Sequence, residues 1–398
     1  MKNNKNNVTT QAYDKAIAVL KGNMSPFGIL ASQKNKSSSS RRYDSIFARD
    51  IGVSSIGILA SADDELIKSL KASLLLLAAH QASNGQIPNF IKPEIKQVDF
   101  WYLGCIDATL WWLIALKQFE RHQPKDQLVN KLDKEIRRAL NWLSCQEHPA
   151  AHLLQQNEAS DWADILPRSG FVLYDNVLWL VVKNLYNILT KHETKRSINY
   201  YFNPWQKVPE TYYKNNYRAK HLISYAQQKV KPDLLWLSYI NFENVGLDGD
   251  LYANILASLS GVKTGQQNKM TIKYIISKKL NSPFPGKSLM NPVELSSKQG
   301  RSYMKIHHQN HPHQYHNGGI WPFIGGFWVL LLAQEKNLLC KLELERLASA
   351  NQQSNWRFTE WLDSTTGRPR GMKHQSWSAA MYILAYQVVN QKFNFSLT

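Results

Sequence analysis

Apolar side chains recur along this chain at the spacing of one face of an α-helix. Leu66, Leu70, Leu74 and Leu77 mark one such face, and residues 377 to 388 repeat apolar positions at i, i+3, i+4, i+7, i+8 and i+11. This period predicts amphipathic helices. Alternating patterns typical of strands are nearly absent, so we expect an all-α protein.

Other segments are apolar almost all round, which predicts helices buried on several sides. Residues 106 to 119, 177 to 189 and 320 to 333 are of this kind, whereas residues 132 to 143 interleave leucines with charges. The expected helices span residues 11 to 21, 50 to 62, 64 to 81, 105 to 120, 129 to 144, 176 to 190, 213 to 229, 248 to 260, 264 to 279, 321 to 335, 337 to 350 and 376 to 390. About twelve helices, some enclosed and some amphipathic, predict an (α/α)6 barrel with a pocket formed by the loops at one end.

Two segments interrupt this rhythm. Residues 33 to 42, QKNKSSSSRR, are polar and Ser-rich, so we expect a mobile loop. Residues 191 to 217 are rich in Lys, Tyr and Asn and contain Pro204 and Pro209, which favours an insertion over the barrel rim. We find no linker between segments, and residues 1–398 are therefore predicted to form a single domain.

The cysteines and the apolar runs indicate where in the cell the protein is expected. Cys105, Cys145 and Cys340 are odd in number and widely spaced, so they indicate neither a disulfide framework nor a zinc site. The N-terminal residues lack the apolar core of a signal peptide, and the longest apolar runs are too short to span a bilayer. We expect a cytoplasmic protein that does not bind membranes.

The chain is strongly basic, with a formal net charge of +18. Its lysines and arginines are scattered, and no helix-turn-helix, zinc-finger or RNA-recognition signature accompanies them. A primary role in nucleic-acid binding is therefore disfavoured, although the sequence does not explain the charge. The pattern does not decide the oligomeric state.

One polar and aromatic turn lies directly ahead of an apolar helix. It is HPHQYHNGGIWPFIGG, residues 311 to 326, in which Gly318 and Gly319 permit a sharp turn and Pro322 suits the first helical position. Stacking rings beside amide and imidazole groups suit a sugar pocket. The alternative is a tight loop whose histidines satisfy backbone groups. His311 and His313 have no carboxylates at a metal-binding spacing, so neither a metal nor another cofactor is expected.

Carboxylates beside aromatic residues recur at or just before expected helix starts. Asp50, Asp107, Asp161 and Asp164 lie in such places, and Glu360 lies between two tryptophans. Glycoside hydrolysis needs one protonated carboxylic acid and one ionised carboxylate, and the 13 tryptophans can supply sugar platforms. Helix caps, a solvated helix start and a surface ion pair are the alternatives for these acids.

Six motifs resemble, in order, those of the (α/α)6 glycosidases, a group that includes the amylo-α-1,6-glucosidase (glycogen-debranching-like) domains and the neutral/alkaline invertases. They are RRYDSIFARDIG (41 to 52), NGQIPN (84 to 89), IDATLWWLIALKQF (106 to 119), DWADILPRSGFVLYDNVLW (161 to 179), YHNGGIWPFIGGFW (315 to 328) and FTEWLDSTTGRPRGMKHQSWSAAMYILA (358 to 385). The resemblance extends across nearly the whole chain.

The resemblance implies an inverting mechanism with a general acid in DWAD and a general base in TEW. The family's acid follows a Trp by two positions, which selects Asp164 over Asp161, and Glu360 matches the base. Their carboxyl groups should then lie roughly 6.5 to 9.5 Å apart. A dry setting beside Trp162 should keep Asp164 protonated, whereas Glu360 should stay ionised.

The resemblance also implies the residues that bind the sugar. Polar contacts are expected from Arg49, Asp50, Asp107, Asp161, Arg168, His316, Asn317 and Gln375. Stacking faces are expected from Trp101, Trp162, Trp321 and Trp377.

A small-molecule carbohydrate is thus the expected partner, and hydrolysis of a small α-glucoside or a branched malto-oligosaccharide by an exo-acting enzyme is the expected function. Invertases carry an Arg-Arg-Met run after the acid, whereas Asp164 is followed by ILPRSG, so sucrose hydrolysis by a β-fructofuranosidase is the first alternative. A sugar epimerase or isomerase of the α/α-barrel type is the second. A basic binding protein that no longer catalyses is a further alternative.

Overall fold

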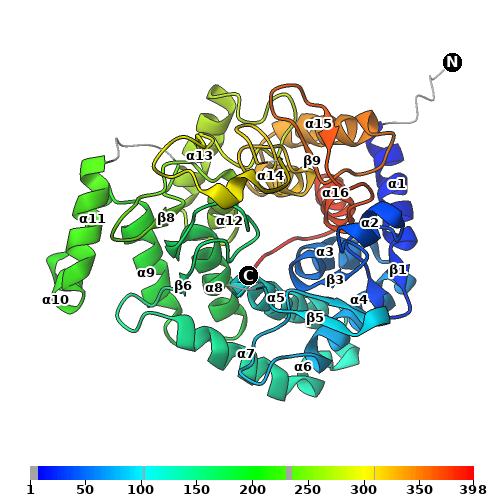
Figure 1. Ribbon diagram of the computed structural model, residues 1–398, viewed down its shortest axis with the longest axis horizontal. Helices are drawn as coiled ribbons and strands as arrows, with labels where there is room; N and C mark the ends of the chain where they lie inside the picture. The colour runs from blue at the N-terminus through cyan, green and yellow to red at the C-terminus, as the bar shows by residue number, and fades with distance from the viewer. Residues whose placement is uncertain (1–7, 102–103, 230–234, 309) are drawn as a thin grey trace.

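The computed structural model describes residues 8–101, 104–229, 235–308 and 310–398, and over these residues it confirms the all-α (α/α)6 barrel. Inner and outer helices alternate along the chain (Figure 1). The inner helices are α3 (Ala48–Ser61), α5 (Ile106–His122), α8 (Leu173–Leu185), α12 (Leu251–Leu259), α14 (Pro322–Gln334) and α16 (Ser376–Val389). The outer helices are α1 (Val8–Gly22), α4 (Asp64–Ala79), α6 (Leu128–Lys131) with α7 (Asp133–Gln146), α9 (Lys191–Phe202), α13 (Gly265–Ser277) and α15 (Leu339–Gln353).

The inner helices are buried on all sides, as their apolar composition predicts. Every residue of α14 from Pro322 to Leu332 is buried, and so is every residue of α5 from Ile106 to Leu116. Each inner helix contacts the next around the ring, and α16 contacts α3. The last inner helix therefore closes the ring against the first.

Glycines permit the closest approaches between the inner helices. A β-carbon on Gly57 of α3 would lie 1.9 Å from the carbonyl oxygen of Ala380 in α16. A β-carbon on Gly326 of α14 would lie 2.8 Å from the Met381 side chain. Because only a residue without a side chain fits at such a crossing, these positions set the spacing at which the ring closes.

The fourth outer helix differs from the one that the sequence pattern predicts. Residues 191 to 217, expected to be an insertion over the rim, contain α9, which packs against α8. The expected helix 213 to 229 is divided into α10 (Glu210–Asn215) and α11 (Tyr217–Lys229), and α11 lies at the periphery against α9 (Figure 1). The buried face of α9 contains the polar residues Thr194 and Ser197. The apolar pattern of the sequence therefore did not predict a helix that packs against the core here.

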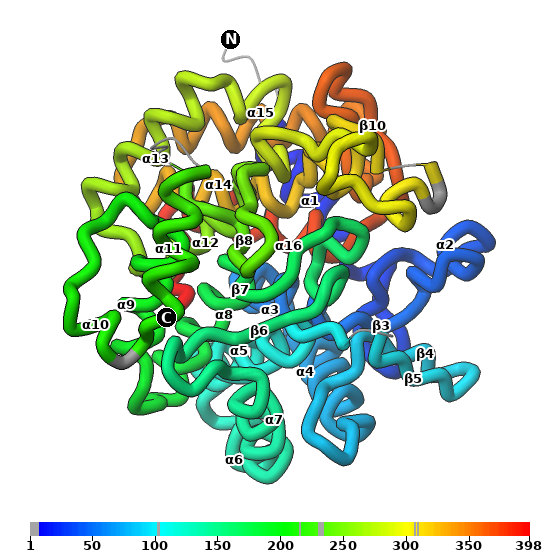
Figure 2. Tube along the Cα trace, turned by 60° about the vertical axis from the view of Figure 1, so that its left-hand side comes forward, coloured from blue at the N-terminus to red at the C-terminus, as the bar shows by residue number. Residues whose placement is uncertain are grey.

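Residues 33 to 42, expected to be a mobile loop, contain the short helix α2 (Lys36–Ser40). Asn35 and Ser38 form reciprocal capping hydrogen bonds at its start. The Ser39 hydroxyl donates to Asp44 at 2.7 Å, and Asp44 pairs with Lys92 at 2.8 Å. These contacts attach α2 to the neighbouring strand β4 (Phe90–Lys92) (Figure 2).

Short antiparallel strands lie at one end of the barrel. Two sheets have two strands each: β1 (Met24–Ser25) pairs with β2 (Gly28–Ile29), and β9 (Trp361–Leu362) pairs with β10 (Pro369–Arg370). One three-stranded sheet consists of β3 (Ile46–Phe47), β4 (Phe90–Lys92) and β5 (Gln97–Asp99). The other consists of β6 (Gln155–Gln156), β7 (Gly170–Val172) and β8 (Tyr239–Ile240). In register, Ile46 faces Ile91 and Phe171 faces Ile240. β3 leads directly into α3 and β7 into α8, so these sheets surround the N-terminal ends of the inner helices.

The C-terminal residues lie at the opposite end of the ring. The Ser396 carbonyl accepts a hydrogen bond from Gln118, near the end of α5, at 3.0 Å, and Leu397 is buried. Three 3-10 turns, η1 (Pro93–Ile95), η2 (Pro124–Asp126) and η3 (Ser302–His308), belong to the described loops. Among the described residues, no helix combines the length and apolar character needed to cross a bilayer. The single-domain organisation stays a prediction.

We expect Gly57→Ala to lower the free energy of unfolding by about 1 to 3 kcal/mol, because the added methyl group overlaps the Ala380 carbonyl group and pushes α3 from α16. Gly265→Ala is the matched control, since its β-carbon would meet nothing within 4 Å, and it should change stability by less than about 1 kcal/mol. Urea denaturation followed by circular dichroism measures both. Equal stability of the two variants would contradict a tight crossing.

Candidate active site

A cavity of about 460 Å³ opens at the N-terminal ends of the inner helices. The carboxylates that line it are Asp50, Asp164 and Glu360. The other lining residues used below are Arg41, Arg42, Tyr43, Arg49, Trp101, Trp162, Tyr315, His316, Trp321 and Trp377. Acids, bases and aromatic rings that converge on one concave surface are typical of a ligand site.

Asp164 presents its carboxyl group to this cavity, and 33% of its side chain remains exposed. Burial raises the pKa of Asp164 to about 7, and the charges of Asp161, Asp107 and Glu360 act in the same direction, against that of Arg49. The His316 Nδ1 atom lies 3.7 Å from its Oδ1 atom. Asp164 can therefore hold a proton near neutral pH, as expected for a general acid.

Glu360 is fixed just before the β9–β10 hairpin. The Tyr43 hydroxyl donates to its Oε1 atom at 2.5 Å, and the Met372 N–H donates to its Oε2 atom at 2.8 Å. Gly371 lies opposite with φ of 71°, where a β-carbon would lie 2.5 Å from Oε2. Burial raises the pKa of Glu360, whereas the bonds from Tyr43 and Met372 lower it. These bonds favour the ionised carboxylate.

Arg49 and Asp50 begin α3 and line the inner part of the cavity. The Arg49 guanidinium donates to both carboxylate oxygens of Asp107, at 2.6 and 3.0 Å, and Asp107 also accepts from the Tyr174 hydroxyl at 3.0 Å. Asp107 is fully buried and outside the cavity lining. Its burial and its bonds to Arg49 support a role in orienting Arg49 in place of the expected direct sugar contact. Burial raises the pKa of Asp50 to about 7.

Four other expected sugar ligands are buried behind the cavity wall. Arg168 pairs with Asp250 at 2.6 Å. Asp161 accepts from the Ala163 N–H at 2.7 Å, close to the turn that carries Asp164. Asn317 bonds to the backbone of Val293, and Gln375 is the N-cap residue of α16. Arg168, Asp161, Asn317 and Gln375 are each at most 1% exposed and do not line the cavity. The contacts of Arg168, Asp161 and Asn317 support structural roles in place of direct sugar contacts. The Gln375 side chain makes no cap hydrogen bond, and neither of its amide atoms has a hydrogen-bond partner among the described residues.

Aromatic rings form the inner wall. Trp162 meets Trp321 edge to face at 5.5 Å, and the His316 ring stacks on Trp321 at 5.1 Å. Burial lowers the pKa of His316 well below its usual range, helped by the charges of Arg168 and Arg49, and this favours the neutral imidazole. The indole N–H groups of Trp162 and Trp377 have no hydrogen-bond partner among the described residues. Both residues line the cavity, although the two indole nitrogens themselves are buried.

The cavity lining also contains Trp101 and residues to which sequence reasoning assigned no role. Trp101 lines the cavity, and its indole N–H donates to the Ala159 carbonyl at 2.9 Å. The unassigned residues include Tyr43 and Tyr315. Both lie within motifs singled out in the sequence, RRYDSIFARDIG and YHNGGIWPFIGGFW. Nothing in those motifs indicated that Tyr43 would reach a glutamate 317 residues away in the sequence.

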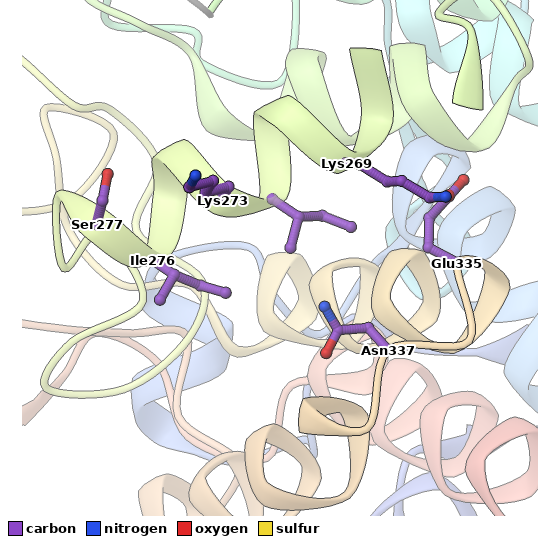
Figure 3. Close-up of a pocket in the computed structure, with 7 residues that line it drawn as sticks. Lys269, Lys273, Ile276, Ser277, Glu335 and Asn337 are labelled. Carbon is purple, nitrogen blue, oxygen red and sulfur yellow. The ribbon is translucent and has the colours of Figure 1, made fainter. Parts of the chain in front are cut away.

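A second cavity, of about 500 Å³, lies between α13 and the connection from α14 to α15 (Figure 3). Its seven lining residues include Lys269, Lys273 and Glu335 but no aromatic ring. It lacks the paired carboxylates and platforms of the first cavity. Among the described residues, no group of three or more His, Cys, Asp or Glu side chains could hold a metal ion.

Comparison with known sequences places residues 66–384 in one family. They match the family model for amylo-alpha-1,6-glucosidase. The chain is also 21% identical over 445 aligned positions to alkaline/neutral invertase C, mitochondrial, of Arabidopsis thaliana, in a match that covers 94% of this chain and 65% of the invertase. That relative is named mitochondrial, so a cytoplasmic location for this chain stays a prediction.

Comparison with solved structures supports the fold. A mannosylglycerate hydrolase of family GH63 from Thermus thermophilus is similar with a TM-score of 0.56 and 13% identity, over 94% of this chain and 99% of that one. A family GH15 glucoamylase from Hypocrea jecorina is similar with a TM-score of 0.61 and 13% identity, over 99% of this chain and 74% of that one. At such identities the likeness shows a shared fold.

We expect Asp107→Ala to lower the free energy of unfolding by about 3 kcal/mol or more, because it leaves the Arg49 charge buried without its partner. Asp133→Ala is the control: it removes an exposed carboxylate paired with Arg137 at 2.9 Å and should leave stability nearly unchanged. Thermal and urea unfolding measure both. An Asp107→Ala protein as stable as the parent would show that Asp107 does not support the fold.

Proposed function

The chain belongs to the amylo-alpha-1,6-glucosidase family of glycoside hydrolases, and we propose that it is an inverting, exo-acting enzyme that cleaves a small α-glucoside or a branched malto-oligosaccharide. One observation carries the proposal: Asp164 and Glu360 line the same cavity in unlike surroundings. Burial brings the pKa of Asp164 to about 7, whereas Glu360 accepts two hydrogen bonds that favour its ionised form. Such a division between two carboxyl groups is what glycoside hydrolysis requires.

In the proposed reaction, Asp164 donates its proton to the glycosidic oxygen as the bond to the anomeric carbon breaks. Glu360 accepts a proton from a water molecule, whose oxygen attacks the anomeric carbon from the opposite face. The products are the free leaving-group alcohol and a sugar whose anomeric configuration is inverted. Proton exchange with water then returns both carboxyl groups to their starting states.

The shape of the cavity supports attack at a chain end. Trp162, Trp321 and Trp377 are at most 5% exposed and line the inner part, where they can enclose a terminal sugar. Arg49 and Asp50 add polar groups at the start of α3. We propose that these five residues, with His316, hold that sugar and that the leaving group points to the exposed mouth.

Sucrose hydrolysis is the second candidate, favoured by the 21% identity to alkaline/neutral invertase C. The segment ILPRSG after Asp164 differs from the Arg-Arg-Met run of invertases, so an α-glucoside stays the first choice. A screen of sucrose, isomaltose, maltotriose, trehalose and glucosylglycerate, with free monosaccharide as the readout, separates the candidates.

We expect Asp164→Asn and Glu360→Gln each to reduce kcat by at least about 100-fold, because each removes one side of the acid and base pair. Glu335→Gln is the matched control, since Glu335 lines the second cavity and should retain activity. Circular dichroism verifies folding. Proton NMR of the first-formed product should show the β-anomer from an α-glucoside. Retained activity in both variants would refute the acid and base assignment, and release of the α-anomer would refute inversion.

The pH dependence of kcat/KM should reflect both carboxyl groups. Asp164 acts protonated, so activity should fall as the pH rises through about 7. Glu360 acts ionised, and Tyr43 lowers the pKa of Glu360 through its hydrogen bond. Tyr43→Phe should therefore move the acidic limb to higher pH and reduce kcat/KM on that limb by about tenfold. Tyr225→Phe, which removes a surface hydroxyl bonded to the Glu243 carbonyl, is the control. An unmoved acidic limb in Tyr43→Phe would contradict the role of this bond.

A further inference from the structure

Two arginines line the mouth of the cavity without an acidic partner among the described residues. Arg41 and Arg42 are exposed and belong to the cavity lining. Three basic side chains of the same region are paired: Arg49 with Asp107 at 2.6 Å, Lys92 with Asp44 at 2.8 Å and Lys34 with Glu94 at 3.2 Å. Arg41 and Arg42 thus contribute positive charge at the mouth that no ion pair neutralises among the described residues.

The backbone that carries the two arginines is held in place on both sides. Arg41 is the C-cap residue of α2, and the following Arg42 adopts a left-handed conformation with φ of 64°. This conformation costs a residue with a β-carbon about 1 to 2 kcal/mol. The Ser39 hydroxyl bond to Asp44 and the Tyr43 bond to Glu360 hold the flanking residues.

The electrostatics differ between the two ends of the cavity. At the inner end the Arg49 charge is balanced by buried Asp107. At the mouth the charge of Arg41 lowers the pKa of Glu360, so its field extends to that carboxylate. A guanidinium binds a carboxylate or a phosphate through two parallel hydrogen bonds. The chemistry that matches the mouth is therefore an anion.

We propose that Arg41 and Arg42 bind a negatively charged group, a carboxylate or a phosphate, on the leaving-group side of the substrate. The inference rests on the proposed function, because it takes the terminal sugar to occupy the aromatic inner end and the leaving group to occupy the mouth. It narrows the substrate class from small α-glucosides in general to those with an anionic aglycone. In this proposal Arg41 and Arg42 determine which leaving group is bound, whereas Asp164 and Glu360 catalyse cleavage of the glycosidic bond.

The test compares substrates that differ only in the charged group. The α-glucosides of glycerate, of glycerol 3-phosphate and of glycerol share a three-carbon aglycone and carry a carboxylate, a phosphate or no charge. We expect the parent enzyme to prefer a charged member, and Arg41→Gln and Arg42→Gln each to reduce the ratio of charged to neutral kcat/KM by about tenfold, mainly through KM. The ratio cancels any effect of Arg41 on Glu360 that both substrates share. The better charged substrate identifies carboxylate or phosphate as the ligand.

Lys36→Gln is the matched control, because it removes one positive charge from α2 at a residue outside the cavity lining. It should leave the charged-to-neutral ratio unchanged. Raising the ionic strength should reduce the preference of the parent enzyme, since the arginines are exposed. Equal kcat/KM for the three substrates, or an equal loss for charged and neutral substrates in the arginine variants, would overturn the proposal.

A binding measurement separates this inference from the proposed function. Calorimetric titration with free glycerate, glycerol 3-phosphate and glycerol requires no turnover. Binding of an anion by the parent protein that weakens by about tenfold in Arg42→Gln but not in Lys36→Gln supports the anion site, even if no glycoside is hydrolysed. Hydrolysis of glycosides without any binding of either anion would overturn the inference and retain the proposed function.

Discussion

Closure of the inner helical ring is the constraint on which the rest of the structure depends. Gly57 of α3 meets the Ala380 carbonyl of α16 with no room for a β-carbon, so the first and last inner helices of the chain become neighbours. The inner helices are buried along their length, and α-helices satisfy their own backbone hydrogen bonds there. Functional polar groups then gather where these helices begin, beside the loops that surround the ring end.

Burial at that end determines the chemistry that the cavity can support. Removal of water raises the pKa of Asp50 and of Asp164, each to about 7. Burial also raises the pKa of Glu360, and the hydrogen bonds that Tyr43 and Met372 donate to it oppose that rise. Two carboxyl groups of similar intrinsic acidity thus acquire unlike surroundings. Asp107 supports this arrangement, because its carboxylate pairs with the Arg49 guanidinium beside the cavity.

The sequence predicted more of the fold than of the contacts within the site. Apolar periodicity identified the inner helices because their burial demands apolar residues almost all round. It missed α9, whose core-facing stripe includes Thr194 and Ser197, since Thr194 bonds there to Lys183 and the His152 carbonyl group. Asp107 and Arg168 belong to motifs that also contain cavity-lining residues, so both were expected to contact the sugar. Sequence spacing could not show that each forms a buried ion pair instead, Asp107 with Arg49 and Arg168 with Asp250.

The sequence by itself determined the helical barrel, the family resemblance and the candidate carboxylates Asp164 and Glu360, because local periodicity and motif identity are properties of neighbouring residues. Only the tertiary structure decided which polar residues face the cavity and which lie behind its wall. Tyr43 approaches Glu360 across 317 residues of chain, and Arg41 and Arg42 reach the same mouth. Such contacts arise from ring closure and from the loss of water that accompanies it, and neither is encoded in the spacing of adjacent residues.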